Sequence, residues 1–108
     1  MSASSELAQY TLDSLRAVSG VRMRRFFGGY AFLSFGAQFA MLMDTLYFRV
    51  DETTRESYLK RGGKPFSYVS RGKVVVLSKY LSVPEGALDD EEELVELARE
   101  AIRVVGNQ

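Results

Sequence analysis

Apolar residues near both ends of the chain recur every three or four positions, which is the spacing of one face of an α-helix. The first such segment covers residues 5–19, with Ser4 as its N-cap and Gly20 where the pattern stops. Ahead of the second segment, Asp90 and Glu93 have the spacing of a capping box. Its apolar face consists of Leu94, Leu97, Ala98, Ala101, Ile102 and Val105. The chain is therefore expected to begin and end with an amphipathic helix.

Residues 21–50 follow the pattern of β-strands, in which neighbouring side chains point to opposite faces. The alternation fails at residues 25–27, so we expect a bulge or a strand end at the glycines that follow. Turn residues at 36–37 and 44–45 divide the rest of this segment into hairpins. The expected strands cover residues 21–27, 30–35, 38–43 and 46–50.

The second half of the chain again has a helix followed by strands, but with fewer strands. Asp51 can cap a more polar helix that ends near Arg61, because two glycines and a proline follow. A second hairpin is expected from residues 66–69 and 74–83. The predicted order is α-β-β-β-β-α-β-β-α. Since closely spaced hairpins pair antiparallel, the fold class is α+β, with a sheet of about five or six strands and helices packed on one face.

Two of the expected strands, residues 30–35 and 38–43, are apolar at nearly every position. Helices on one face of a sheet normally leave polar residues on the other, as in strand 46–50, where Tyr47 and Arg49 should point outward. Either a partner covers the second face, or the sheet curls and its own loops close it. Self-association is the simpler explanation. A homodimer, or a strong protein-binding surface on these strands, is therefore expected.

Composition narrows the possible functions. The 108 residues, 46% of them hydrophobic, suffice for one domain with a single core. The 14 basic and 14 acidic residues cancel, and the chain has no Cys and no His, which excludes disulfides, thiolate metal sites and histidine-based catalysis. No apolar run reaches the roughly 18 residues that a membrane helix needs. Residues 1–6 lack the parts of a signal peptide, so a cytoplasmic protein is expected.

A basic and aromatic segment is the first candidate for a binding site. Arg22, Arg24 and Arg25 precede Phe26 and Phe27, and this mixture of cations and rings is typical of surfaces that bind nucleic acid. The same arginines equally suit an exposed strand on which charge deters pairing with other sheets. Because the net charge is zero, we favour the second interpretation and expect the chain alone to bind DNA weakly.

Other candidate motifs also have ordinary structural explanations. Gly28-Gly29 lacks the pattern of a phosphate-binding loop, so a turn between strands is expected there. Lys79 interrupts an apolar strand and could pair with a carboxylate or belong to an interface. The acidic run at residues 89–93 suits a helix start and lacks the spacing of a calcium loop. No cofactor, metal or catalytic group is expected; a ligand-binding or enzymatic pocket near the two glycines remains an alternative.

Four blocks of the sequence, in their order and spacing, resemble one known family. The first is Arg25-Phe26-Phe27-Gly28-Gly29-Tyr30, which is like the family's R-x-[MF]-F-G-G-[YF] block. The others lie at residues 39–42 with 46–51, between 66 and 84, and at 94–99. Together they resemble the N-terminal domain of the TfoX/Sxy regulators of bacterial competence. The chain departs from the family at Lys79, where members often have Tyr.

The resemblance implies a non-enzymatic α+β domain that takes part in transcription and competence regulation. Full-length members act as coactivators with the cyclic-AMP receptor protein, so it also implies a transcription-factor complex as the protein partner. The family's helical C-terminal domain is absent from residues 1–108, which are expected to form a single TfoX N-terminal-like domain. No active-site residues carry over. The candidates for interaction are Arg22, Arg24, Arg25, Phe27, Gly28, Gly29, Tyr30 and Lys79.

Overall fold

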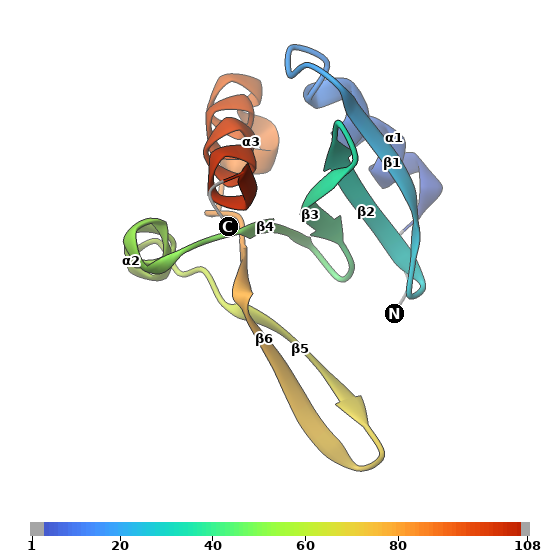
Figure 1. Ribbon diagram of the computed structural model, residues 1–108, viewed down its shortest axis with the longest axis vertical. Coiled ribbons are helices and arrows are strands. Elements are labelled where there is room, and N and C mark those ends of the chain that lie inside the picture. Colours follow the sequence, from blue (N-terminus) through green and yellow to red (C-terminus); the bar gives the residue numbers. More distant parts are fainter. Residues whose placement is uncertain (1–3, 107–108) are drawn as a thin grey trace.

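Six strands form one antiparallel sheet, and helices cover part of it (Figure 1). The computed structural model describes residues 4–106, so residues 1–3, which belong to the segment that argues against a signal peptide, and the chain end at 107–108 lie outside it. The elements are α1 (Ser5–Ser14), β1 (Val21–Phe26), β2 (Gly29–Ser34), β3 (Ala37–Leu42), β4 (Leu46–Arg49), α2 (Glu52–Lys60), β5 (Pro65–Ser70), β6 (Lys73–Ser82), η1 (Ala87–Asp89, a 3-10 turn) and α3 (Glu91–Gly106). The predicted α+β class and element order are confirmed.

One hydrophobic core lies between the sheet and the helices. Helix α3 packs on β3 and β4, and α1 lies against β1 and α3 (Figure 1). Phe32, Phe39 and Phe48 from the strands and Tyr58 from α2 are buried in this core almost completely. The apolar faces of the two terminal helices therefore pack into the same core.

The buried face of α3 differs from the predicted one by a small rotation. Leu94, Ala98 and Ala101 are buried as expected, but Leu97 is only partly buried. Val95 and Val104, which were not assigned to the apolar face, are buried instead. The helix crosses two strands and also contacts α1, so its covered stripe is wider than a single row of side chains.

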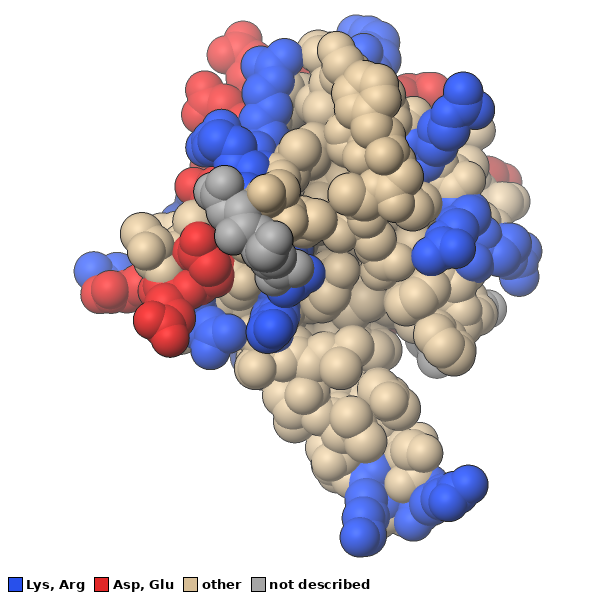
Figure 2. Space-filling model, viewed as in Figure 1, with Lys and Arg blue, Asp and Glu red and all other residues tan. Residues whose placement is uncertain are grey.

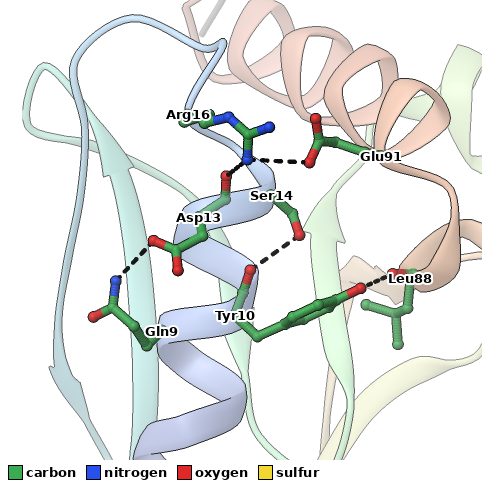
Figure 3. A network of polar contacts seen from close by, with 7 residues as sticks. All are labelled: Gln9, Tyr10, Asp13, Ser14, Arg16, Leu88 and Glu91. Atoms are coloured by element: carbon green, nitrogen blue, oxygen red, sulfur yellow. Dashed lines mark hydrogen bonds and ion pairs between the residues drawn. The ribbon is translucent and has the colours of Figure 1, made fainter.

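Helix α1 ends at Ser14, five residues before the predicted end, and the segment that follows it contacts α3 (Figure 3). The Arg16 guanidinium donates to the Asp13 carbonyl at 3.1 Å and forms an ion pair with Glu91 at 3.3 Å. Arg99 of α3 donates to the carbonyl of Ala17 at 3.0 Å. The contacts with Glu91 and Arg99 join residues more than 70 positions apart, which helical periodicity does not report.

The predicted caps of α2 and α3 form to different extents. Asp51 and Thr54 form a complete capping box at the start of α2. At α3, Asp90 accepts a hydrogen bond from the Glu93 backbone at 3.2 Å. The Glu93 carboxylate does not complete a box; it accepts two hydrogen bonds from Arg61, at 2.6 and 3.2 Å, and so ties α2 to α3.

The order of strands places one hairpin beyond the helix-covered body. The sheet order is β1-β2-β3-β4-β6-β5. Strand β4 pairs with the end of β6, from Tyr80 to Ser82, so the rest of β6 has only β5 beside it. The β5–β6 hairpin therefore extends away from the body (Figure 1). Its strands are shifted in register between Pro65 and Phe66, where β6 contains the extra residues of a large bulge.

Three hairpins in the described residues turn on two-residue loops that end in glycine: Phe27-Gly28, Phe35-Gly36 and Arg71-Gly72. All six residues have positive φ, as type I′ turns require. The predicted turn at residues 36–37 is thus displaced by one position. Strand β1 ends at Phe26 without a bulge; the irregularity lies between Phe32 and Leu33, where β2 pairs with β3.

The apolar strands β2 and β3 are buried on both faces. Ala31 and Met41 point away from the helices yet are 0% exposed, and Tyr47, expected to face outward, is buried on the same side. The chain's own residues cover this face, as when Tyr47 meets Phe66 with ring centroids 5.3 Å apart. The expectation that these strands expose apolar surface is therefore wrong, and the second alternative, a self-closing sheet, describes the structure. The homodimer stays a prediction without this support.

Candidate functional site

An apolar hollow lies between the β1–β2 turn and the β5–β6 hairpin. Its volume is about 270 Å³. It is lined by residues from three separate parts of the chain: Phe26, Phe27, Met43, Phe66, Tyr68 and Leu77. A more open hollow adjoins it and adds Asp44, Tyr47 and Lys64. Exposed apolar surface that the described chain leaves uncovered is a common mark of a binding site.

The β1–β2 turn places Phe27 at the rim of this hollow. Phe27 has φ of 46° and is 85% exposed, which is unusual for a large apolar residue. Its ring meets Phe26 edge-on with centroids 4.7 Å apart. Gly29 brings the same turn close to Met43, because a Cβ atom at Gly29 would lie 2.2 Å from the Leu42 carbonyl oxygen. The glycines therefore shape one wall of the hollow.

Aromatic rings of β5 form the opposite wall. Phe66 stacks against Tyr68 with centroids 6.0 Å apart, and Tyr47 contacts Phe66 edge-on. Leu77 lies opposite Phe66 on β6. These rings hold one another in place, so this wall is preformed.

The other face of the hairpin is also apolar, and it is open to solvent. Val69 and Val74 form a cross-strand pair and are 70% and 68% exposed, and Val76 is 52% exposed. Strand β5 is at the edge of the sheet, so one side of its backbone has no neighbouring strand. A hairpin with apolar residues on both faces and an open edge is poorly suited to solvent unless something binds it.

Charge is separated along the chain even though its total is zero. No acidic residue occurs between Asp13 and Asp44, between Asp44 and Asp51 or between Glu56 and Glu85, so none of the six strands contains one. Figure 2 shows basic side chains at the tip of the β5–β6 hairpin and no acidic ones along it, whereas acidic side chains gather beside α2. The hollow therefore lies in the basic part of the molecule.

The structure brings only some of the predicted interaction residues together. Phe27 and Gly28 border the hollows, whereas Gly29 and Tyr30 are buried in the sheet. Arg25 lies over the Tyr30 ring, 5.2 Å from its centroid. The remaining candidates are exposed and lie outside both hollows: Arg22, Arg24 and Lys79.

Sequence reasoning missed most of the hollow. Phe66, Tyr68 and Leu77 were treated only as strand residues, although they line the hollow, and Met43 was included only in the protein-binding surface expected on strand 38–43. One available signal was the second hairpin itself, where apolar side chains occupy both faces of a segment without a helix in its pattern. Such a hairpin indicates surface that the domain does not bury.

Tyr47 is the titratable residue whose pKa is most clearly altered beside the hollow. Burial raises the pKa of Tyr47, and the hydrogen bond that its hydroxyl donates to Asp44 at 2.7 Å, with the negative charge of that carboxylate, raises it further. The phenol therefore stays protonated near neutral pH.

In residues 4–106 no cluster of three or more acidic, His or Cys side chains could hold a metal ion. Within the same residues no helix is long and apolar enough to cross a membrane.

We expect Tyr47 to make the fold sensitive to alkali. Its pKa is higher in the folded chain than the usual value of about 10 in an unfolded one, so its contribution to stability is full below that pH and is lost as the pH rises above it. Urea unfolding measured from pH 8 to 11 should show a steeper alkaline loss in the wild type than in Tyr47→Phe. Identical pH profiles would mean that Tyr47 titrates normally.

Replacing Phe27 with Asn should leave the fold intact. Asn tolerates positive φ, which relieves strain of about 1 kcal/mol, while the lost edge contact with Phe26 costs about 0.5–1.5 kcal/mol. The free energy of unfolding should therefore stay within about 1 kcal/mol of the wild type in urea denaturation. A loss of more than about 2 kcal/mol would show that Phe27 is chiefly a packing residue. The matched control is Phe35→Asn, at a turn of the same type at the other end of β2.

The comparison with known proteins agrees with the block that surrounds this turn. The family described as TfoX N-terminal domain matches residues 13–105, nearly the whole chain. No curated protein matches the sequence closely. The match includes every residue that lines the hollow and all six strands of the sheet. The chain therefore belongs to the TfoX N-terminal domain family.

Proposed function

We propose that this chain is a non-enzymatic regulatory module that binds a protein partner in the cytoplasm and acts in transcription, including the control of competence. The partner is a transcription-factor complex such as the cyclic-AMP receptor protein. The family match supports a TfoX-like module. The observation that carries the proposal is the β5–β6 hairpin, which leaves the body and has uncovered apolar residues on both faces.

The chemistry around the hollow supports binding rather than catalysis. Its lining is four rings, a methionine and a leucine, with no ionisable side chain except the Tyr68 phenol. The adjoining Asp44 accepts a hydrogen bond from Tyr47, whose raised pKa makes it a poor acid or base at neutral pH. Apolar and aromatic surface of this kind is typical of the centre of a protein interface.

Binding to the cyclic-AMP receptor protein, loaded with cyclic AMP on its DNA site, tests the proposal. A double variant, Val69→Thr with Val74→Thr, keeps β-branched residues in the hairpin but removes apolar surface. It should weaken binding by about tenfold, as expected when part of an interface centre is lost. Leu59→Gln is the control, since it removes a half-exposed apolar side chain from α2. No binding by the wild-type chain, or equal weakening by both variants, would contradict the proposal.

We expect specific DNA binding by the chain alone to be absent. Arg25 is engaged with Tyr30, and only Arg22 and Arg24 of the arginine group extend freely from β1. Duplex DNA should therefore bind no more tightly than about 10⁻⁴ to 10⁻⁶ M at physiological salt, the usual non-specific range. A fluorescence titration checks this. Sequence-selective, salt-sensitive binding that is lost in the Arg22, Arg24 and Arg25 triple alanine variant would overturn the expectation.

A further inference from the structure

The hollow at the β1–β2 turn has the size of a socket for a side chain. Its volume of about 270 Å³ is enough for one large side chain, and the adjoining, more open hollow of about 710 Å³ leaves room for the rest of a docked segment. Phe26 and Phe27 line one side, and Phe66 and Tyr68 line the other. One large apolar side chain fits this space and would be shielded from water on several sides.

The surroundings of the socket favour an acidic occupant. Lys64 borders the adjoining hollow, and Arg71 and Lys73 stand at the tip of the same hairpin. Arg24 lies opposite Ala31 in the register, on the face of the sheet away from the helices, as Met41 and Tyr47 do. Asp44, the one carboxylate on the lining of the adjoining hollow, accepts a hydrogen bond from the Tyr47 hydroxyl at 2.7 Å. These four cations outnumber the single carboxylate, so the formal charge around the socket is positive.

We propose that this socket docks an acidic, amphipathic segment of the partner protein, with an apolar side chain seated between the β1–β2 turn and β5. Carboxylates that flank this anchor face Lys64 and the cations of β1 and the hairpin tip. The inference rests on the proposed function and names the chemistry of the partner at this surface. Apolar contact supplies the affinity, and opposite charge selects the partner and speeds the encounter.

Nucleic acid fits the socket less well, although cations and rings are both present. A base needs a ring with an uncovered face on which to stack. The Phe66 ring is stacked by Tyr68 and met edge-on by Tyr47, and Phe26 is met edge-on by Phe27. Phe27 is the one ring of the lining that is mostly exposed, at 85%, so the socket offers a single open ring and not the row of platforms on which successive bases stack.

A synthetic peptide tests the inference independently of any natural partner. The probe has about 12 residues, with Leu and Phe anchors among Glu residues, a length that suits a single docked segment. Two matched peptides replace Glu with Lys, or Leu and Phe with Ser. Titrated into the ¹⁵N-labelled chain, the acidic amphipathic peptide should shift the amide signals of residues 26–29, 43, 66–68 and 77. The two matched peptides should leave those signals in place.

Paired variants locate the binding. Phe27→Asn should weaken binding of the peptide by about tenfold. Phe35→Asn, which removes a similarly exposed ring from the type I′ turn between β2 and β3, should change the affinity by less than about twofold. Lys64→Glu should weaken binding of the peptide by about threefold or more. Lys60→Glu on α2 makes the same change of charge and should leave the affinity unchanged. Equal effects within either pair would overturn the proposal.

Other occupants would also give clear results. If the amide signals of the socket residues shift with protein concentration in the absence of peptide, a second copy of the chain fills the socket and the proposal is wrong. If single-stranded DNA of about 12 nucleotides displaces the peptide and shifts the same amides, the site belongs to nucleic acid. If the chain binds the cyclic-AMP receptor protein with unchanged affinity in Phe27→Asn and no peptide binds, the proposed function stands and this inference fails.

Discussion

Replacing Leu94 with Ala is expected to lower the free energy of unfolding by about 2–5 kcal/mol. Leu94 is 0% exposed and belongs to the core in which α3 packs on β3 and β4. Removal of its side chain beyond Cβ loses apolar burial and leaves a cavity that rigid neighbours cannot close, because sheet residues such as Phe48 are fixed by strand pairing. Urea denaturation monitored by far-UV circular dichroism measures the change.

The same substitution at Leu97 provides the comparison. Leu97 lies one turn further along α3 and is only partly buried, so Leu97→Ala should cost less than about half as much. The identical change in chemistry isolates burial as the variable. Equal losses at the two positions would mean that the buried stripe of α3 is the one predicted from sequence rather than the one in the structure.

Replacing Gly29 with Ala should be almost as damaging, with an expected loss of about 3 kcal/mol, at the upper end for overpacking. A Cβ atom there would lie 2.2 Å from the Leu42 carbonyl oxygen and 2.7 Å from the Met43 sulfur. The first neighbour is backbone, so the clash can be relieved only by moving β2 away from β3. Thermal and urea unfolding should both show the loss, and the socket beside Met43 should change shape with it.

Gly36→Ala is the control for this prediction. Gly36 has φ of 85°, and a Cβ atom there would meet nothing within 4 Å. Ala at this position therefore adds only the strain of a left-handed backbone, which lowers stability by about 1–2 kcal/mol. A loss at Gly29 clearly larger than at Gly36 would confirm that close approach, and not turn conformation, requires the glycine. Similar losses would contradict it.

The two glycines of the family block thus have separate tasks. Gly28 provides the second positive φ of a hairpin turn, whereas Gly29 lets two strands approach closely. Tyr30 is buried and receives Arg25 over its ring. Phe27 is the residue of the block for which the fold supplies the least packing, since it is 85% exposed. Phe27 is therefore the residue of this block that is available to contact a partner at the socket.

Much of the local structure follows from the sequence because its causes are local. Asp51 predicts the start of α2, and glycines between apolar runs predict hairpin turns, since caps and turns depend on residues within a few positions of one another. The period of apolar residues separates helices from strands for the same reason. Fold class and element order are sums of such signals, and so they could be predicted.

What only the tertiary structure decided involves residues far apart in the chain. The segment after α1 contacts α3 instead of continuing the helix, and the burial of Met41 and Tyr47 depends on how the sheet closes on itself. The socket needs residues 26–27, 43 and 66–77 to meet, which follows from β4 pairing with one end of β6 and from the bulge that redirects its hairpin. Strand order and bulges are chosen by the packing of the whole core, and no local pattern encodes that choice.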